Sequence, residues 1–347
     1  MKILTLTRPM LRRPILRRPI LRRTMLSRAV LAAAALALPL AAPAAAEFPE
    51  KDLTHIMPWS AGGGTDTVMR QFMSFAEKTL GTGINTQNVT GAQSGIGTLR
   101  LMKARPDGYT IGSLTWDSVI TVPYYELVPG YDTDQLAYLG SVTVHPTALI
   151  VRADAPYATL DDFVAAAKSA PGTLKIANVG TGGVWHLPAL DFAKEAGIDV
   201  QHIPYPKGSG PEREALLSGE VDAMSSSISA AYAAVQAGQA RVLAVMSEER
   251  DPKFPEVPTF RDSGYDVVWG SFRLVATQAR VDADKRAALE AGFAAVFDLP
   301  EFQQAAEKSA MGAHWMDAEA TAAYVKAAQA KAFALIDELV AEGVLQK

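Results

Sequence analysis

The chain has 347 residues, of which 49% are apolar, and it contains no cysteine. This length and apolar content can supply two hydrophobic cores, so we expect two domains. The lack of cysteine argues against a disulfide framework, a thiolate metal site and a lipid anchor on cysteine.

A basic segment and then an apolar segment open the chain. The first 46 residues hold nine of the 33 Lys and Arg and no acidic residue, and they end in the run AVLAAAALALPLAAPAAA. This order is typical of an export signal, so we expect residues 1–46 to be a signal peptide cleaved near Ala46 and the protein to be periplasmic. Met25 would also start an ordinary signal, and Arg22 with Arg23 resembles a weak twin-arginine signal. Both start sites and both export routes stay open.

Removal of such a leader changes the charge of the chain. Residues 47–347 carry 24 Lys and Arg against 37 Asp and Glu, a net charge of about −13 with neutral histidine. An acidic chain without a basic stripe argues against nucleic acid and anionic lipid as partners. An anionic ligand would therefore have to be held by local donors.

Strand-like and helix-like segments alternate from Glu47 onward, which predicts an α/β fold with parallel sheets. The strand-like runs, in chain order, are LTHIM, INTQNV, YTIGSL, ALIVRA, LKIAN, QHIPY, VDAM and RVLAVM. Two segments, 137–153 and 265–276, are long enough to cross between two domains. The alanine-rich segments 284–297 and 317–341 have helical periodicity and are predicted to pack on a sheet.

Four glycine-containing loops each follow a strand-like run and precede helical periodicity. They are Pro58–Asp66 (PWSAGGGTD), Asn88–Gly97 (NVTGAQSGIG), Asn178–Leu187 (NVGTGGVWHL) and Pro204–Pro211 (PYPKGSGP). Glycine at such a turn can serve backbone geometry alone. It can also leave N–H groups open to an anion at the start of a helix. Because the pattern recurs four times, we expect the loops to form the rim of one anion-binding site.

The sequence offers little support for an enzyme. Its five histidines are scattered, which argues against a metal site. The nearest approach to a nucleophile elbow, Gly91-Ala92-Gln93-Ser94-Gly95, has its serine in the wrong place. There is no Walker lysine pattern and no dinucleotide fingerprint, so we expect no cofactor.

Single residues in these loops allow two interpretations each. Asp66 is either an N-cap or a ligand contact, with the N-cap favoured. His186 is either a hydrogen-bonded structural histidine or a ligand donor. Trp59 and Trp185 either pack beside glycine turns or cover a ligand. Arg273, in GSFRLVA, is either a surface cation or a ligand contact near both domains.

Five motifs, in order and spacing, resemble the Bug-type receptors of tripartite tricarboxylate transporters. They are PWSAGGGTD, NVTGAQSGIG, GTGGVWHL, IPYPKGSGPEREALLSGEVDAM and RVLAVMSEERDPKFPEVPTFRDSGYDV, and the similarity covers essentially all of residues 47–347. The resemblance implies a two-lobed α/β periplasmic binding fold of type II, with two parallel-rich sheets joined by two crossover strands. One lobe would hold residues 47–151 and 269–347, and the other residues 152–268.

The same resemblance implies a monomeric receptor that is not an enzyme. It would capture a small organic acid between its lobes and deliver it to membrane permease subunits. Carried over residue by residue, its contacts would be Trp59, Ser60, Ala61, Gly62, Gly63, Gly64, Asp66, Gly91, Ala92, Gln93, Ser94, Trp116, Asp117, Thr181, Gly182, Gly183, His186, Lys207, Gly208, Ser209 and Arg273. Asp222 matches a position expected to be structural.

Three departures from the family pattern leave the ligand open. Pro206 is an extra residue in its loop, VTGAQ replaces a common proline-glycine version, and Thr277-Gln278-Ala279 stands where a proline-glycine turn is frequent. An exported hydrolase using Ser94, His186 and either Asp66 or Asp117 is the alternative from another class. A third hypothesis is a receptor that reports to a sensor kinase instead of a permease.

Overall fold

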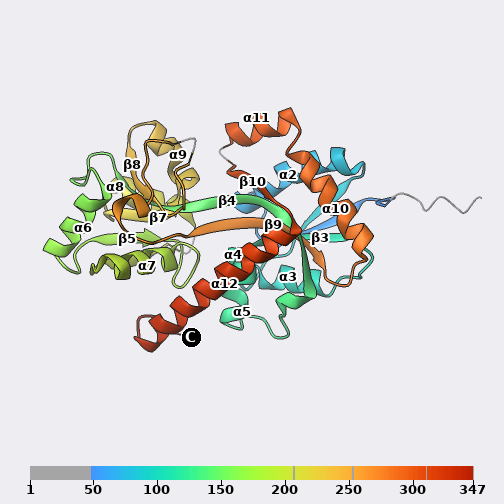
Figure 1. Ribbon diagram of the computed structural model, residues 1–347, viewed down its shortest axis with the longest axis horizontal. Helices are drawn as coiled ribbons and strands as arrows, with labels where there is room; N and C mark the ends of the chain where they lie inside the picture. The colour runs from blue at the N-terminus through green and yellow to red at the C-terminus, as the bar shows by residue number, and fades with distance from the viewer. Residues whose placement is uncertain (1–47, 206–207, 252–253, 310, 347) are drawn as a thin grey trace, which may run out of the picture. The chain divides into compact units, whose positions relative to one another are not determined.

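Two sheets organise the computed structural model, which describes residues 48–205, 208–251, 254–309 and 311–346 (Figure 1). The predicted signal peptide and Lys207 lie outside these residues. The first sheet has strand order β2-β1-β3-β9-β4-β10, and the second has order β8-β4-β7-β5-β6. The strands are β1 (Leu53–Met57), β2 (Ile84–Asn88), β3 (Thr110–Thr115), β4 (Leu136–Arg152), β5 (Lys175–Asn178), β6 (Gln201–Pro204), β7 (Ala223–Ser227), β8 (Ala240–Val245), β9 (Gly270–Gln278) and β10 (Ala313–Met316).

Each sheet has a parallel part and an antiparallel part. In the first sheet β2, β1 and β3 are parallel, and β9, β4 and β10 follow as antiparallel neighbours. In the second sheet β6, β5 and β7 are parallel, whereas β4 runs antiparallel to β7 and β8. We call the elements around the first sheet the first lobe and those around the second sheet the second lobe. This confirms the two-lobed α/β fold.

The two sheets share one strand. β4 is buried along most of its length because its apolar run is covered on both faces, and it passes from the first sheet into the second. A second connection runs beside it, where Trp269 N donates to Met246 O and Thr147 N donates to Trp269 O, each at 2.9 Å. The predicted crossing segments 137–153 and 265–276 therefore coincide with β4 and with the start of β9.

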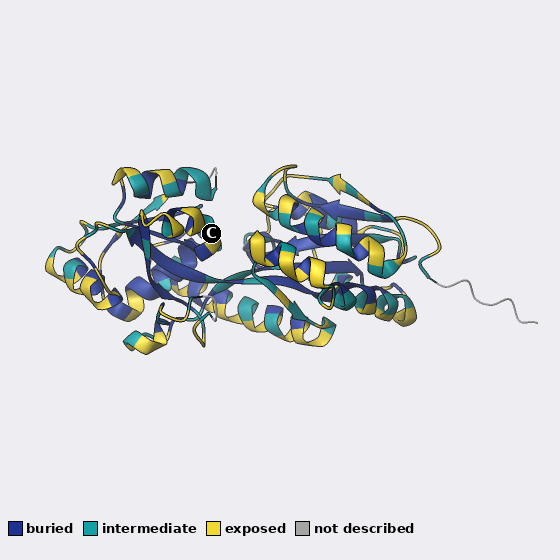
Figure 2. Ribbon diagram, turned by 90° about the horizontal axis from the view of Figure 1, so that it is seen from above, coloured by how far each residue is buried: buried dark blue, intermediate teal, exposed yellow. Residues whose placement is uncertain are grey.

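Helices cover both sides of the sheets, with their polar residues facing outward (Figure 2). In the first lobe, α2, α10 and α11 lie on one side of the crossover strands and α3, α4 and α5 on the other (Figure 1). The helices are α2 (Gly64–Leu80), α3 (Gly95–Met102), α4 (Trp116–Val119), α5 (Thr121–Tyr124), α6 (Leu160–Ser169), α7 (His186–Ala196), α8 (Ser209–Ser218), α9 (Ile228–Gln236), α10 (Ala283–Val296), α11 (Pro300–Lys308) and α12 (Ala318–Ala341), with 3₁₀ turns at Thr133–Gln135 and Arg261–Ser263.

The long helix α12 joins the two lobes on one side. Its residues Val325, Leu335 and Ile336 belong to an apolar cluster that also contains Leu114 of β3 and Phe192 of α7. The predicted helical segments 284–297 and 317–341 match α10 and α12 within a residue or two. Both helices pack on the sheets as expected.

Strand register brings the carboxyl edges of the two sheets to face each other. Thr115, at the end of β3, pairs with Arg273 of β9, which pairs with Thr143 of β4. Ser227, at the end of β7, pairs with Thr147, also on β4. Along β4, Thr143 and Thr147 are four residues apart, which is about 13 Å in an extended strand. The loops that follow the parallel strands of both sheets therefore open toward one another.

Two features differ from the sequence prediction. The strand-like run VDAM is displaced, because β7 spans Ala223–Ser227 and so includes three buried serines. Serine is tolerated there because Ser225, Ser226 and Ser227 pair with Leu149, Ala148 and Thr147 of the buried strand β4. The short strand β10 was not predicted, since four residues beside β4 give no periodic signal.

Candidate functional site

The loops at the two facing edges contain almost every predicted contact. After β1, β2 and β3 come residues 58–63, residues 89–94 and α4. After β5, β6 and β7 come residues 179–185, the loop that leads into α8, and α9. All the predicted contacts that the structure describes lie in these loops or in the first turns of their helices, except Arg273, which lies on β9.

Asp66 holds the first glycine loop in place. Its carboxylate accepts hydrogen bonds from Gly62 N (2.9 Å), Asn88 Nδ2 (2.8 Å) and Arg70 Nε. Burial raises the pKa of Asp66, but these hydrogen bonds outweigh it and hold the pKa below its ordinary value. The N-cap of α2 is Gly63, so the favoured N-cap interpretation of Asp66 is wrong. Asp66 is the third residue of α2, and from there its side chain reaches back to Gly62 in the loop before the helix.

The loop itself presents backbone N–H groups. Ser60, Ala61, Gly62 and Gly64 are exposed, and α2 begins at Gly64. The first N–H groups of a helix have no acceptor in a preceding turn, and they carry the positive end of the helix dipole. Trp59, beside the loop, is half-buried and donates through Nε1 to Thr115 Oγ1 at 3.3 Å. Gly62 N and Gly63 N already donate to Asp66 and to Ser60 O, so the donors left to an anion are the N–H groups at the start of α2.

The second loop has an unusual backbone. Ala92, Gln93 and Ser94 all have positive φ angles (45°, 50° and 81°) although none of them is glycine. Each such residue costs on the order of 1–3 kcal/mol, and strain of this kind concentrates at binding and catalytic sites. The side chain of Ser94 is buried and lies 2.8 Å from Ser118 Oγ, which also accepts from Thr115 N. This pair ties the second loop to α4.

The two residues predicted after β3 have different surroundings. Trp116 is 2% exposed and belongs to the apolar cluster that includes α12. Asp117 is half-buried, accepts a hydrogen bond from Thr121 Oγ1 at 3.0 Å, and has its pKa raised to about 6 by burial. Its carboxyl group therefore titrates near neutral pH.

In the second lobe, His186 fixes the glycine loop after β5. Its Nδ1 accepts from Gly182 N at 2.9 Å, so the ring proton lies on Nε2, which has no hydrogen-bond partner in the described residues. Burial, with a smaller effect of His202, lowers the pKa of His186 to about 3. Gly182 has a φ of +70°, and a Cβ there would lie 2.6 Å from Tyr125 Oη. The loop thus meets the first lobe closely at Tyr125.

Arg273 lies beside the first turn of α2, next to the first glycine loop. Its Nε donates to Thr65 Oγ1 (3.4 Å) in the first turn of α2, and its Nη1 donates to Thr143 Oγ1 (3.2 Å). Its neighbour Phe272 packs against Tyr324 of α12, so Arg273 points to the opposite face of the sheet. Burial lowers the pKa of Arg273 to about 10, which leaves it charged at neutral pH.

The positive charge of Arg273 is not paired with a carboxylate of the described residues. The positive end of α2 lies beside it, so two positive groups meet in a half-buried place. An anion between them would satisfy both. The arrangement can therefore bind a carboxylate through the guanidinium and the N–H groups of the loop.

The geometry does not support the hydrolase alternative. Ser94 is hydrogen-bonded to Ser118, and Nδ1 of His186 is engaged by Gly182 N. A serine nucleophile needs a histidine base within hydrogen-bond reach. In the described residues these two side chains have other partners.

Several residues at the edges were missed by sequence reasoning. Thr65 and Thr143 position Arg273, Ser118 holds Ser94, and Tyr125 touches Gly182. Thr143, Ser118 and Tyr125 belong to no glycine motif, whereas Thr65 lies inside the first one, Pro58–Asp66. Only the fold could reveal them, because strand register and side-chain direction bring them to the site.

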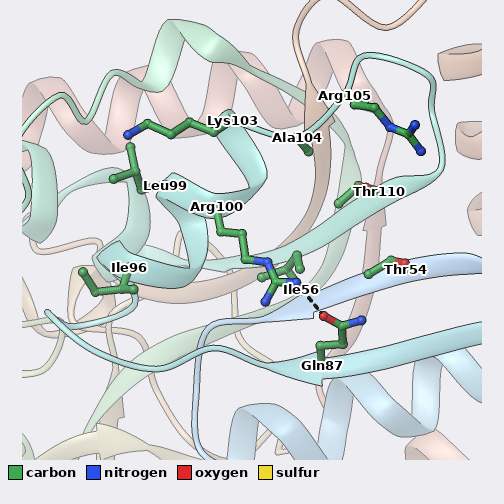
Figure 3. Close-up of a pocket in the computed structure, with 10 residues that line it drawn as sticks. All are labelled: Thr54, Ile56, Gln87, Ile96, Leu99, Arg100, Lys103, Ala104, Arg105 and Thr110. Carbon is green, nitrogen blue, oxygen red and sulfur yellow. Dashed lines mark hydrogen bonds between the residues drawn. The ribbon is translucent and has the colours of Figure 1, made fainter.

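A separate basic hollow of about 590 Å³ lies between α3 and the strands β1, β2 and β3 (Figure 3). Arg100, Lys103 and Arg105 line it, together with polar residues of β1, β2 and β3. Arg100 Nη2 donates to Gln87 Oε1 at 2.8 Å. None of the predicted ligand contacts lines this hollow.

Comparisons with known proteins identify the family of this chain. The model of the tripartite tricarboxylate transporter family receptor matches residues 68–340. The chain belongs to this receptor family. The receptor is 32% identical to the "UPF0065 protein in gbd 5'region" of Cupriavidus necator over 309 residues, 87% of this chain and 93% of that protein.

Solved structures of similar proteins have the same fold. A TctC solute-binding protein from Polaromonas is 30% identical, with a TM-score of 0.75 over 84% of this receptor and 100% of that chain. MatC from Rhodopseudomonas palustris, solved with bound malate, is 25% identical, with a TM-score of 0.69 over 83% and 100%. The receptor is thus a TctC-type periplasmic solute-binding protein. Within its described residues, every helix is too short or too polar to cross a membrane.

Proposed function

We propose that this receptor captures a small organic acid between its two lobes, without transforming it, and delivers it to the permease subunits of a tripartite tricarboxylate-type transporter. The observation that carries the proposal is the unbalanced positive charge of Arg273 beside the start of α2. Burying a charge is costly unless it is paired, so this place favours an anionic ligand. The malate bound to MatC supports a carboxylate.

The contacts in this proposal come from both edges. The first lobe contributes the N–H groups of the loop at Ser60–Gly64, the strained loop at Gly91–Ser94, and Asp117. The second lobe contributes the loop at Thr181–His186 and the start of α8 at Ser209. Donors from two lobes would let the bound anion favour a closed arrangement, which a membrane partner can distinguish from the open one.

The organisation of the chain belongs to the same proposal. Residues 1–46 would act as a cleaved signal peptide. Residues 47–151 with 269–347 would form one lobe and residues 152–268 the other, and the receptor would work as a monomer. Membership of β1–β3 in one sheet and of β5–β8 in the other supports this division.

A ligand screen tests the proposal. The purified protein is heated with mono-, di- and tricarboxylates, with malate first, and with amino acids and neutral sugars as comparison. A carboxylate at ~100 times its Kd should stabilise the fold by about 2.7 kcal/mol. If no acid raises the melting temperature, or if neutral sugars raise it equally, the proposal is wrong.

A further inference from the structure

A buried carboxyl group lies behind the second-lobe half of the site. Glu212, in the first turn of α8, is 0% exposed. Neither of its carboxyl oxygens has a hydrogen-bond partner of good geometry in the described residues. An ionised carboxylate in such a place is costly. Sequence reasoning did not single out this residue.

Two serine hydroxyls, those of Ser209 and Ser226, lie beside the carboxyl group of Glu212. Ser209 begins α8, and Ser226 lies in β7 just before the strand ends. Their Oγ atoms are 3.5 Å apart. Both hydroxyls favour the charged form of Glu212, but burial outweighs them and raises its pKa to about 8. At neutral pH the side chain is therefore mostly a neutral acid, which can donate its own proton.

The protonation state of Glu212 decides where the serine protons point. A hydroxyl has one proton to donate and can also accept. If Glu212 is protonated, it donates to the serine pair, and the proton of Ser209 stays available to a ligand carboxylate. If Glu212 is ionised, it accepts a serine proton, and lone pairs of the hydroxyls face the ligand instead. A negative charge then also lies behind the start of α8, whose positive end would otherwise attract the ligand.

Few other charged groups face Glu212. Neither β7 nor α9 contains a charged residue, and Tyr232 of α9 packs on Phe254. On its own helix, Glu214 is exposed and Arg213 donates to Ala230 O. The carboxyl group is thus isolated from cations on these elements.

The other neighbours of Glu212 fall into two groups. Two of them titrate outside the range from pH 7 to pH 9, and the others lie at other ends of their strands. Tyr205, after β6, donates to Glu220 and has its pKa raised to about 12 by burial. His202 of β6 faces His186, and burial lowers its pKa to about 4. Three more groups lie elsewhere: Lys175 at the start of β5, Arg152 of β4 at the end of α8, and His145 of β4 beside Gly312.

We propose that Glu212 is a positioning residue whose protonated carboxyl group keeps the hydroxyl proton of Ser209 directed at the ligand, so that its ionisation weakens carboxylate binding. This inference rests on the proposed function, because it assigns a role to the second-lobe half of the same site. It predicts a receptor that binds its acid more weakly as the pH rises above neutral.

The first test needs no ligand. Because the pKa of Glu212 is raised in the fold, ionisation favours the unfolded chain, and the wild type loses stability relative to Glu212→Gln as the pH rises from 4.5 to 8. The melting temperature of Glu212→Gln minus that of wild type should therefore grow over this range. Glu214→Gln, an exposed change on the same helix, should show a constant difference. A constant difference for Glu212→Gln would contradict a buried neutral acid.

The second test measures the Kd of malate, or of the acid that gives the largest shift in the screen, by calorimetry at pH 7, 8 and 9. The wild-type Kd should rise up to about tenfold between pH 7 and pH 9, because the competent form becomes a minor fraction. Glu212→Gln should keep the Kd of pH 7 within about twofold at pH 9, since its amide still donates. The weak deprotonation of Arg273 in this range is common to both proteins.

A third protein tests whether the hydroxyl of Ser209 transmits the effect of the Glu212 charge to the ligand. Ser209→Ala should bind more weakly than wild type at pH 7 and lose most of the pH dependence. If Ser209→Ala keeps the wild-type pH dependence, the serine does not carry the effect. If Glu212→Gln and wild type share one pH profile, the inference fails while the receptor function stands. If no carboxylate binds at any pH, the proposed function itself fails.

Discussion

The guanidinium of Arg273 donates from Nη1 to the hydroxyl of Thr143, and the two residues are register partners on the two strands that connect the lobes. The cation of the site therefore belongs to the connection between the lobes rather than to a mobile surface loop. Thr65 holds the same side chain from the first turn of α2. A carboxylate bound there would touch the crossover strands and the glycine loop together.

Replacing Arg273 tests the main electrostatic contact. Arg273→Met should weaken carboxylate binding by about 1.5–3 kcal/mol, because it removes charge-assisted hydrogen bonds. Folding should change little or improve, since the variant removes a half-buried charge that has no ionic partner. Calorimetry and thermal melting measure both effects. Arg100→Gln, in the basic hollow outside the site, should leave binding unchanged, and an equal loss in both variants would show a non-specific effect of charge.

Gly182 should resist substitution for two separate reasons. Alanine there adopts a left-handed backbone, at a cost of roughly 1–2 kcal/mol, and its Cβ would collide with Tyr125 Oη. Gly197→Ala provides the matched control, because Gly197 has a φ of +60° and open space. Denaturant unfolding should show a larger loss for Gly182→Ala than for Gly197→Ala. Adding Tyr125→Phe to Gly182→Ala removes the hydroxyl and should reduce this additional loss of unfolding free energy. If the additional loss is unchanged, the alanine does not collide with Tyr125 Oη.

Asp66 should matter for stability above acidic pH. Its pKa is lowered in the fold, so its contribution is fully present above its ordinary value of 3.8 and is lost as the pH falls below it. Asp66→Asn should therefore lose about 1–3 kcal/mol of unfolding free energy at pH 7, and the loss should shrink below pH 3.8. Asp154→Asn removes a carboxylate that is 78% exposed, so it should cost less than about 0.5 kcal/mol. Equal effects of the two variants would contradict the role of Asp66.

His186 should contribute to unfolding in weak acid. Burial lowers its pKa to about 3, so the neutral ring stabilises the fold above pH 6.5 and this stability is lost as the pH falls from 6.5 toward 3. Over that range each such histidine should cost about 1.4 kcal/mol per pH unit. His186→Gln should reduce the slope of unfolding free energy against pH by about that amount. An unchanged slope would show that the ring is protonated in the fold.

The sequence predicts most of the fold because the signals are local. Apolar runs give β1, β3 and β4, alanine-rich periodicity gives α10 and α12, and glycine clusters mark the loops of the edges. The short strand β10 gives no such signal. The run VDAM predicts only the start of β7, and pairing with β4 extends the strand through Ser225–Ser227.

The sequence predicts where the loops lie, but not the contacts inside them. Glycine motifs locate the loops, yet the roles inside them depend on distances that the sequence does not contain. Asp66 was expected to cap α2, but it reaches back to Gly62. Ala92 and Gln93 have left-handed backbones without being glycine, and Glu212 becomes neutral only because the fold removes it from water. Such features arise from tertiary packing.

The shared strand has a mechanical consequence. Register irregularities with its neighbours occur at Ser141–Thr143 and at Leu149–Ile150, and Pro146, which has no N–H, lies between them. Bending that brings the lobes together would concentrate in this stretch. Points near a pivot move least, and Arg273 pairs with Thr143 inside this stretch. A carboxylate on Arg273 would keep that contact while the distant loops swing toward it, so the same ion pair could start the capture and survive into the final complex.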